Sequence, residues 1–401
     1  MEDIERIASI AETELEREAA NDPEIKKIIR IVKKFIQTHR VLCYGGTAIN
    51  NILQKKDQFY NFDLEIPDYD FYSETPQDHA KKLSDILANA GIADVESKPG
   101  IHLGTFKVFA KYTGVADISN LDTPIFAKLW KESIVKDDIH YVPPNFLRMS
   151  IYLELSRPRG DVSRWAKVYK RLVLLNAEYP LEECSKDDID YHDEKLEHLS
   201  QIEHLIKNEA ILLGYNAVNI QENKHEWVLP IDLLAEPKDA LNLANRISHL
   251  FKNSKVHGYT EYAELLPPHY DVVDGKRLLV RIFETDACHS YHELESGLKV
   301  ASIPTILNFL FAMMYADRHF TEKTTHQRLI CTCQKLVELA NNSRKRRFKL
   351  LTPLTCIGQQ KGLIDMKKEK TELYEKLSKH RTSEDFLRYF FSYKPKMAKR
   401  P

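Results

Sequence analysis

Apolar residues recur at helical spacing through the first forty residues of the chain. Two such runs are separated by Asp22 and Pro23, a pair typical of a helix N-cap followed by the first helical turn. We therefore expect an N-terminal helical segment over residues 1–38. The apolar positions are Ile4, Ile7, Ile10, Ile25, Ile28, Ile29, Val32 and Ile36.

From residue 39 to residue 182 the pattern switches repeatedly between strand-like and helical runs, which predicts an α+β domain. The short run VLCY ends at Gly45 and Gly46 and is followed by the helical pattern TAINNILQK. The segment FDLEIPDYDFYS alternates and is rich in aromatic residues, so it predicts a strand. A helix should follow and stop near Gly91, and HLGTFKVFAKY and VADISNLD should form further strands.

The second half of the chain resembles the first. RVLCYGGTAIN (40–50) matches EAILLGYNAVN (209–219), which places Gly214 opposite Gly45. PDYDFYSETPQDHAKKL matches LPIDLLAEPKDALNLAN, with Asp232 opposite Asp70. Because several weak matches occur in the same order, we infer two related modules.

The second copy is degenerate, because Tyr215 replaces Gly46 and Pro230 replaces Asp68. Two weaker matches complete the alignment: Ile101-His102 with Val256-His257, and VADIS with ETDAC around Asp286. We assign residues 195–318 to this module and do not expect catalysis from it. Residues 319–401 predict a helical C-terminal region with the basic run Arg344-Lys345-Arg346-Arg347, which fits a phosphate-binding patch, a nuclear address or a solvated surface equally well.

The amino-acid composition excludes only a few classes of protein. Lysine and arginine (58) nearly balance aspartate and glutamate (59), so any nucleic-acid footprint must be local. No apolar stretch reaches the length of a membrane span, and the acidic amphipathic start lacks the features of a signal peptide. The six scattered cysteines indicate reduced thiols in a cytosol-like compartment, and the lone Cys331-Cys333 pair does not complete a zinc site.

Three carboxylates carry the candidate chemistry. Asp68 and Asp70 are two apart on a predicted strand and project from one face, where they can share a pair of divalent cations. Asp117 in VADIS is the best third ligand from a neighbouring strand. Oxygen ligands suit magnesium, and manganese is an alternative. Less specific readings are a solvated or capping pair for Asp68 and Asp70 and a structural role for Asp117, since Asp122 lies close by.

The strand–glycine–helix turn is the candidate nucleotide-binding element. Gly45 and Gly46 allow close approach of a phosphate, and the helix N-terminus offers free N–H groups. Thr47 and Asn50 lie in the same helix and could add polar contacts. The alternative is a plain tight turn.

A basic stretch, SRPRGDVSRWAKVYKR, holds cations at helical spacing that could meet triphosphate or RNA backbone, although charge runs are commonly solvated faces. The candidates are Arg157, Arg159, Arg164, Lys167 and Lys170.

The segments YGGTAIN, PDYDFYS, DIS and FLRMSIYLELSRPRGDVSRWAKVYKRLVLLN resemble the catalytic poly(A) polymerases of large cytoplasmic DNA viruses, the mimivirus-type relatives of the poxvirus enzyme. The resemblance implies a polymerase-β-type nucleotidyltransferase module over 39–182, a degenerate second copy, ATP as substrate and RNA 3′ ends as primer. It places Asp68, Asp70 and Asp117 on the metal triad and Gly45, Gly46 and Thr47 on the nucleotide-binding turn. It also implies a cytoplasmic viral factory or virion.

The expected activity is thus polynucleotide adenylyl transfer to RNA 3′ ends without sequence preference or a membrane partner. Three rivals remain: a nucleotidyltransferase with another nucleotide or acceptor, a non-catalytic RNA-binding or processivity subunit, and a second module that serves as a homodimer scaffold. The spacing of about twenty residues between the glycines and Asp68 is longer than is usual in the wider superfamily. No residue identifies an adenine pocket, a tail length or a cap-modifying partner.

Overall fold

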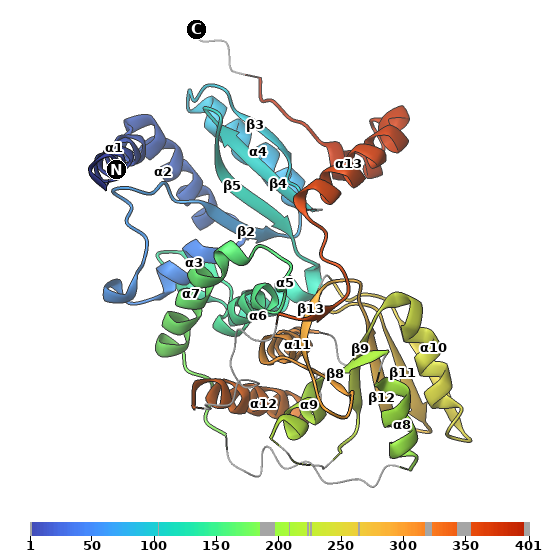
Figure 1. Cartoon of the computed structure of the whole chain (residues 1–401). Helices are drawn as coiled ribbons and strands as arrows, with labels where there is room; N and C mark the ends of the chain where they lie inside the picture. The colour runs from blue at the N-terminus through green and yellow to red at the C-terminus, as the bar shows by residue number, and fades with distance from the viewer. Residues whose placement is uncertain are drawn as a thin grey trace. The chain divides into compact units, whose positions relative to one another are not determined.

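The computed structural model of the chain (Figure 1) describes residues 2–102, 104–184, 197–207, 209–222, 224, 227–263, 265–316, 323–342 and 354–396. These residues form two compact units, Met1–Pro143 with Leu363–Pro401, and Pro144–Gly362. This division differs from the boundaries expected from the sequence, because residues 144–178 group with the second unit and the C-terminal helices group with the first. The basic run at residues 344–347 and most of the acidic linker after Cys184 lie outside the described residues.

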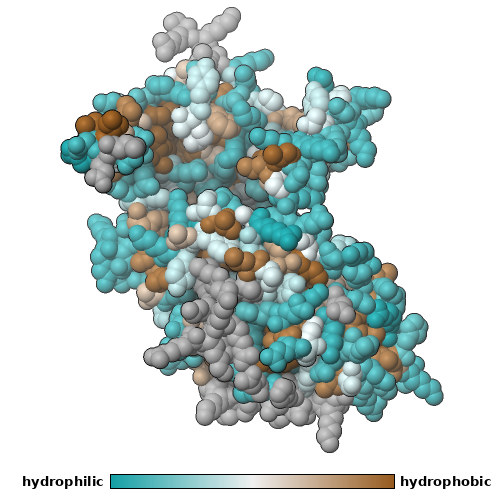
Figure 2. Space-filling view, viewed as in Figure 1, coloured by the Kyte–Doolittle hydropathy of each residue, from teal (hydrophilic) through white to brown (hydrophobic). Residues whose placement is uncertain are grey.

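The first unit begins with two helices, α1 (Glu2–Asn21) and α2 (Pro23–Thr38), as the apolar spacing predicts. The Asp22 carboxylate accepts hydrogen bonds from the backbone N–H groups of Glu24 and Ile25, which satisfies two donors of the first turn of α2. Helix α2 buries an apolar stripe that includes Ile28 and Phe35. The large apolar residues of α1, Ile4, Ile7, Ile10 and Leu15, stay exposed, and Figure 2 shows brown atoms gathered where Figure 1 places this helix.

The described residues of the first unit form a seven-stranded mixed sheet in the order β3-β4-β5-β2-β1-β7-β6. Strand β2 pairs antiparallel with β1 and parallel with β5, so the central strands carry the segments that hold the candidate aspartates. The strands are β1 (Leu42–Tyr44), β2 (Tyr69–Ser73), β3 (Glu96–Pro99), β4 (Thr105–Ala110), β5 (Thr113–Asn120), β6 (Ile134–Lys136) and β7 (Ile139–Tyr141); the helices between them are α3 (Gly45–Ile52), α4 (Pro76–Asn89) and α5 (Thr123–Glu132).

The sheet of the second unit repeats this order strand for strand, as β10-β11-β12-β9-β8-β14-β13, with β15 added at the edge in the part of the unit that is described. Each pair of neighbours keeps the parallel or antiparallel sense of its counterpart. The internal repeat inferred from the sequence is therefore a structural duplication. Its strands are β8 (Ala210–Leu212), β9 (Ile231–Ala235), β10 (Ser254–Tyr259), β11 (His269–Asp274), β12 (Arg277–Glu284), β13 (His289–Glu293), β14 (Lys299–Ala301) and β15 (Cys356–Ile357); its helices include α8 (Leu199–Ile206), α9 (Gly214–Gln221) and α10 (Pro237–Ser248).

Helix α11 (Ile303–Tyr315) is buried on all sides and packs against α6 (Pro144–Leu155) and α12 (Lys323–Asn342). The buried guanidinium of Arg148 ties α6 to α7 (Trp165–Glu178), because Nε donates to Asn176 Oδ1 at 2.7 Å and Nη1 donates to Asn145 Oδ1 at 2.6 Å. These helices complete the second unit.

The C-terminal helices α13 (Leu363–Leu377) and α14 (Glu384–Phe390) belong to the first unit. After α14, Tyr393 forms an antiparallel bridge to Ser97 of β3, with both backbone N–H···O distances at 2.9 Å. The Tyr393 hydroxyl also donates to Asp85 of α4 at 2.6 Å. The end of the described chain thus completes the edge of the first sheet.

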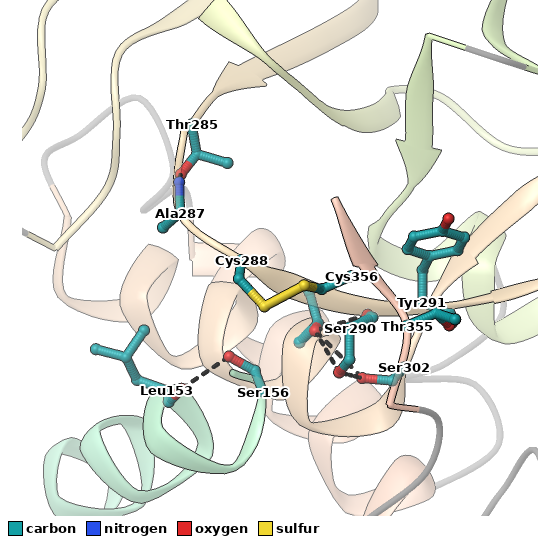
Figure 3. The surroundings of a disulfide bond; sticks show 11 residues. Leu153, Ser156, Thr285, Ala287, Cys288, Ser290, Tyr291, Ser302, Thr355 and Cys356 are labelled. Carbon is teal, nitrogen blue, oxygen red and sulfur yellow. Dashed lines mark hydrogen bonds between the residues drawn. A yellow bond between two sulfur atoms is a disulfide. The ribbon is translucent and has the colours of Figure 1, made fainter. Parts of the chain in front are cut away.

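The expectation of six reduced thiols is wrong for four of them. Cys184 is bonded to Cys331, and Cys288 to Cys356, while Cys43 and Cys333 are free and buried. The cysteines of each pair are far apart in sequence, so spacing gave no sign of either bond. Figure 3 shows that the Cys288–Cys356 bond joins β13 to the segment that carries β15.

No helix among the described residues has the length and apolar character needed to cross a bilayer.

We predict that the purified chain, denatured in urea with iodoacetamide and no reductant, gains two alkyl groups by intact mass, because disulfide sulfurs do not react. Prior reduction should raise the count to six. Reduction should also lower the free energy of unfolding by about 2–4 kcal/mol for each bond. A Cys43→Ala/Cys333→Ala variant, which should gain none without reductant, is the control. Six alkyl groups without reduction would contradict the two bonds.

Candidate active site

The turn between β1 and α3 brings the backbone against a carboxylate. Gly45 has φ +72°, a conformation that favours glycine. A Cβ added at this position would lie 2.6 Å from Asp70 Oδ2, a distance that real Cβ atoms do not tolerate. The antiparallel pairing of Tyr44 with Asp70 sets this contact. Gly45 is therefore required both by its own backbone conformation and by the position of Asp70.

The candidate carboxylates lie near the start of β2 and in the middle of the neighbouring strand β5. Asp70 in β2 is the register partner of Asp117 in the parallel strand β5. Asp68 lies one residue before β2 and not within it, at an exposed position. All three charges act on the Tyr44 hydroxyl, whose pKa is raised by burial first and then by Asp70, Asp117 and Asp68. The structure thus pairs Asp70 with Asp117 and places Asp68 within electrostatic range of Asp117, while their role as metal ligands stays a prediction.

The electrostatics of the cluster favour an added cation. Partial burial raises the pKa of the Asp68 carboxyl, and the negative charge of Asp117 raises it further, whereas Lys107 acts in the opposite direction. Lys107 is the register partner of Asp117 in β4 and donates to its carboxylate. Sequence reasoning missed Lys107. The alternation of TFKVFA nevertheless places Lys107 on the face of β4 opposite the buried residues Phe106 and Val108.

Within the described residues, no three histidine, cysteine, aspartate or glutamate side chains are arranged to hold a metal ion as they stand. In this arrangement the Asp117 carboxylate is turned to Lys107. The donor set nevertheless fits a hard divalent cation, because it consists of carboxylate oxygens whose mutual repulsion a cation would relieve. Metal binding at this place requires Asp117 to exchange its contact with Lys107 for the ion.

The polar residues of α3 have partners within the fold. The Thr47 hydroxyl donates to the backbone oxygen of Asp68 at 2.6 Å. Asn50 is fully buried, and its Oδ1 accepts from the backbone N–H groups of Phe59 and Tyr60 at 2.8 and 3.0 Å. These bonds hold the long loop between α3 and β2 and position Asp68. They give Thr47 and Asn50 a structural role beside the nucleotide contact expected from the sequence.

The candidate basic residues all lie in the second unit, whereas the aspartates lie in the first. Arg157 follows α6, is half-buried and lines a cavity. Arg164 is exposed and contacts Glu154, with Nε 3.1 Å from Oε1. The remaining three, Arg159, Lys167 and Lys170, are exposed. Trp165 donates its indole N–H to the backbone oxygen of Glu154 at 3.2 Å, which identifies it as a packing residue.

The second module keeps the turn but changes the charges. Gly214 has φ +63°, and a Cβ there would lie 2.7 Å from Asp232 Oδ2, as at Gly45 and Asp70. Asn216 donates to the backbone oxygen of Pro230 at 3.3 Å, in the way that Thr47 donates to Asp68. The matches of Gly214 with Gly45 and of Asp232 with Asp70 are thus confirmed at the level of backbone geometry.

Two weaker matches from the sequence are wrong. The register partner of Asp232 in the parallel strand β12 is Arg281, which therefore takes the place of Asp117; Asp286 lies beyond the end of that strand. His257 lies within β10, whereas His102 follows the end of β3. The errors arose because short letter matches were aligned without the register of the sheet.

In the second module, the guanidinium of Arg281 occupies the position that the carboxylate of Asp117 has in the first module. Arg281 Nη1 lies 3.6 Å from Asp232 Oδ1, and its Nε donates to Asp271 Oδ1 at 3.2 Å. All three side chains are nearly inaccessible to solvent. Burial raises the pKa of Asp232 to about 6, and Arg281 acts in the opposite direction. Because the positively charged Arg281 replaces the third carboxylate, the described residues of the second module lack the three carboxylates that a pair of metal ions would need.

Residues 30–161 match the family model described as "Poly(A) polymerase catalytic subunit". Two viral proteins, each described as a "putative poly(A) polymerase catalytic subunit", are similar to this chain. The protein of Acanthamoeba polyphaga mimivirus is 29% identical over 184 residues, which cover 44% of this chain and 31% of that protein. The protein of African swine fever virus (isolate Pig/Kenya/KEN-50/1950) is 28% identical over 172 residues, which cover 41% and 36%.

The crystal structure of the Megavirus polyadenylate synthase superposes on 98% of this chain and 84% of that chain, with a TM-score of 0.79 and 20% sequence identity. This likeness confirms the fold class, an α+β module followed by a second copy of similar fold. The resemblance to viral poly(A) polymerase catalytic subunits stated from the sequence is confirmed as well. The matched segments span about a third of the length of the mimivirus and African swine fever virus proteins.

We predict that Arg281→Met lowers the free energy of unfolding by about 3–5 kcal/mol, because it leaves Asp232 and Asp271 buried without their cation. Urea denaturation followed by circular dichroism measures this. The control is Arg277→Met, at the exposed start of the same strand, which should cost less than about 1 kcal/mol. Equal effects of the two substitutions would show that the buried guanidinium does not hold this carboxylate pair.

Proposed function

We propose that this chain is a poly(A) polymerase that adds AMP from ATP to RNA 3′ ends. The observation that carries the proposal is the convergence of Asp68, Asp70 and Asp117 beside the Gly45 turn. The second module provides an internal contrast, since the same backbone there holds Arg281 in place of the third carboxylate. A binding subunit would have no need to keep the acidic set in one copy only.

The proposed reaction is a displacement at the α-phosphorus of ATP. The RNA 3′-oxygen forms the new bond to phosphorus, the bond from phosphorus to the α–β bridging oxygen breaks, and pyrophosphate leaves with the electron pair. The proton of the 3′-hydroxyl passes to water. When bound, two divalent cations supply charge neutralisation at the triphosphate and lower the pKa of the attacking hydroxyl.

The chain's own residues would hold and orient these groups. Asp68 and Asp70 would bind both cations, magnesium or manganese, and Asp117 would bind the one nearest the 3′-hydroxyl. The backbone N–H groups at Gly45 and Gly46 would receive the β- and γ-phosphates at the start of α3. Because protons compete with cations for the Asp68 carboxylate, whose pKa is raised, metal affinity should fall as the pH is lowered.

RNA would bind through its phosphates and without sequence preference, so its affinity should decrease with salt. The exposed cations Arg159, Arg164, Lys167 and Lys170, together with Arg157, are the candidate contacts. The viral relatives favour a cytoplasmic viral factory or virion as the place of action. Homodimer formation stays a prediction, as does the use of residues 39–182 and 195–318 as separate domains.

We predict a ladder of extended products from a labelled RNA with an oligo(A) 3′ end, in magnesium or manganese, with ATP and not with GTP, CTP or UTP. Asp68→Ala/Asp70→Ala should reduce the rate by about a thousandfold or more, because several kcal/mol of charge stabilisation are lost. The control is Asp63→Ala, an exposed carboxylate of the preceding loop. Extension with every nucleotide would favour the broader transferase, and RNA binding without extension would favour a binding subunit.

Gly45→Ala should weaken Mn²⁺ binding by about tenfold or more, because the new Cβ displaces Asp70. Gly91→Ala is the matched control: Gly91 also has positive φ (+83°), but nothing lies within 4 Å of its added Cβ. Both substitutions should cost roughly 1–2 kcal/mol of stability. Calorimetric titration with Mn²⁺ separates them. Unchanged affinity in Gly45→Ala would remove Asp70 from the metal site.

A further inference from the structure

A cavity of about 270 Å³ lies within the second unit, apart from the carboxylate cluster described above. Its walls come from α6, the connection between β10 and β11, the segment between β12 and β13, and α11. Apolar side chains, among them Leu153, Leu266 and Phe309, form about half of the lining, and polar side chains form the rest. The volume lies just below the usual range for ligand pockets and suits a group smaller than a nucleotide.

Two nitrogen atoms of the lining are buried and have no hydrogen-bond partner among the residues that the structure describes. His289 is 3% exposed, and its Nδ1 has no hydrogen-bond partner among the described residues. The Nε of Arg157 is likewise buried and has no partner in the part of the chain that is described. Buried polar groups of folded proteins nearly always have partners, so these two atoms indicate a bound group that supplies them.

The charges of the lining argue against an anion. Arg157 is the cation of the cavity, whereas Glu261 and Asp286 contribute two exposed carboxylates. His289 is neutral near pH 7, because burial, and then the charge of Arg157, lowers its pKa to about 3. A free phosphate or carboxylate would therefore meet a net negative lining.

The lining offers both hydrogen-bond donors and acceptors beside an aromatic ring. The guanidinium of Arg157 is a donor, and the imidazole of His289 lies with its centroid 5.4 Å from that of Phe309. Asn308 donates from Nδ2 to the backbone oxygen of Met149 at 3.1 Å, which leaves its amide oxygen as an acceptor. A flat, neutral heterocycle with a carbonyl or ring nitrogen beside an N–H group matches this combination.

One wall of the cavity is fixed by the chain that follows it. Cys288, next to His289, is bonded to Cys356, and β15 pairs with β13 at this point. The backbone N–H of Gln359 donates to the oxygen of Asp286 at 2.5 Å. Figure 3 shows the Cys288–Cys356 disulfide and, in its surroundings, three residues of the lining, Leu153, Thr285 and Ala287. A wall held in this way is preorganised, which lowers the entropic cost of binding.

We propose that this cavity binds a single nucleobase, with Arg157 and His289 as its hydrogen-bonding partners. The choice of a nucleobase among flat heterocycles rests on the proposed polymerase function. The base could belong to the RNA or to the incoming nucleoside triphosphate, since the recognised chemistry is the same.

The test is binding of the nucleosides adenosine, uridine, cytidine and guanosine to the full chain, observed by saturation-transfer difference NMR. The variants are Arg157→Met and His289→Leu, with Arg277→Met and His249→Leu as controls at exposed positions of the same unit. At least one nucleoside should bind, and each cavity variant should raise its Kd by about tenfold or more. Displacement of that nucleoside by oligo(A) RNA identifies RNA as the source of the base, and displacement by ATP alone identifies the nucleotide.

Thermal unfolding distinguishes a ligand contact from a structural one. His289→Leu removes a buried group without a partner, so its melting temperature should equal or exceed that of the parent. A large decrease would show that His289 stabilises the fold, and would overturn the proposal. So would nucleoside affinities that the cavity variants leave unchanged, or the absence of nucleoside binding in a protein that extends RNA. Because the readout needs no turnover, a chain that binds nucleosides but never extends RNA would contradict the polymerase and not the cavity.

Discussion

In both modules, a close contact between a glycine backbone and an aspartate carboxylate determines where that carboxylate lies relative to the neighbouring strand and helix. At Gly45 the chain leaves β1 in a left-handed conformation and passes so close to Asp70 that no side chain fits. The same contact recurs at Gly214 and Asp232. In both modules it fixes a carboxylate beside the first turn of a helix, where N–H groups and a positive dipole end are available. The residues paired with these two aspartates on the neighbouring strands, Asp117 and Arg281, lie next to this contact.

What differs between the modules is the charge on the neighbouring strands. In the first, Asp70 faces Asp117, with Lys107 beyond it; in the second, Asp232 faces Arg281, with Asp271 beyond it. Across three neighbouring strands the first module therefore has two carboxylates followed by an ammonium group. The second module has a carboxylate, a guanidinium and a carboxylate in the same order. In the second module a buried guanidinium neutralises the carboxylates. The same backbone therefore holds neighbouring carboxylates in one copy and a carboxylate beside a buried guanidinium in the other.

The sequence predicted many of the helices and strands well, because these depend on local patterns, whereas the role of the acidic residues stays a prediction. Asp22 caps a helix, and the aspartates at 70 and 117 face each other, as the spacing indicated. The misplacement of Asp286 had another cause, since strand register depends on hydrogen bonds between segments far apart in the chain. The disulfides depend on such distant contacts too, since Cys184 and Cys331 are 147 positions apart in the sequence. No local pattern carries that information.

The pairing of Tyr393 with Ser97 has a consequence for synthesis on the ribosome. The first unit is interrupted by the whole of the second, so its sheet edge cannot be completed until residues 363–396 have been made. The second unit, by contrast, is continuous and can fold as soon as it emerges. During translation the nascent chain therefore carries an unfinished first unit with the strand edge of β3 open, and an open strand edge is a site at which partly folded chains can pair and aggregate.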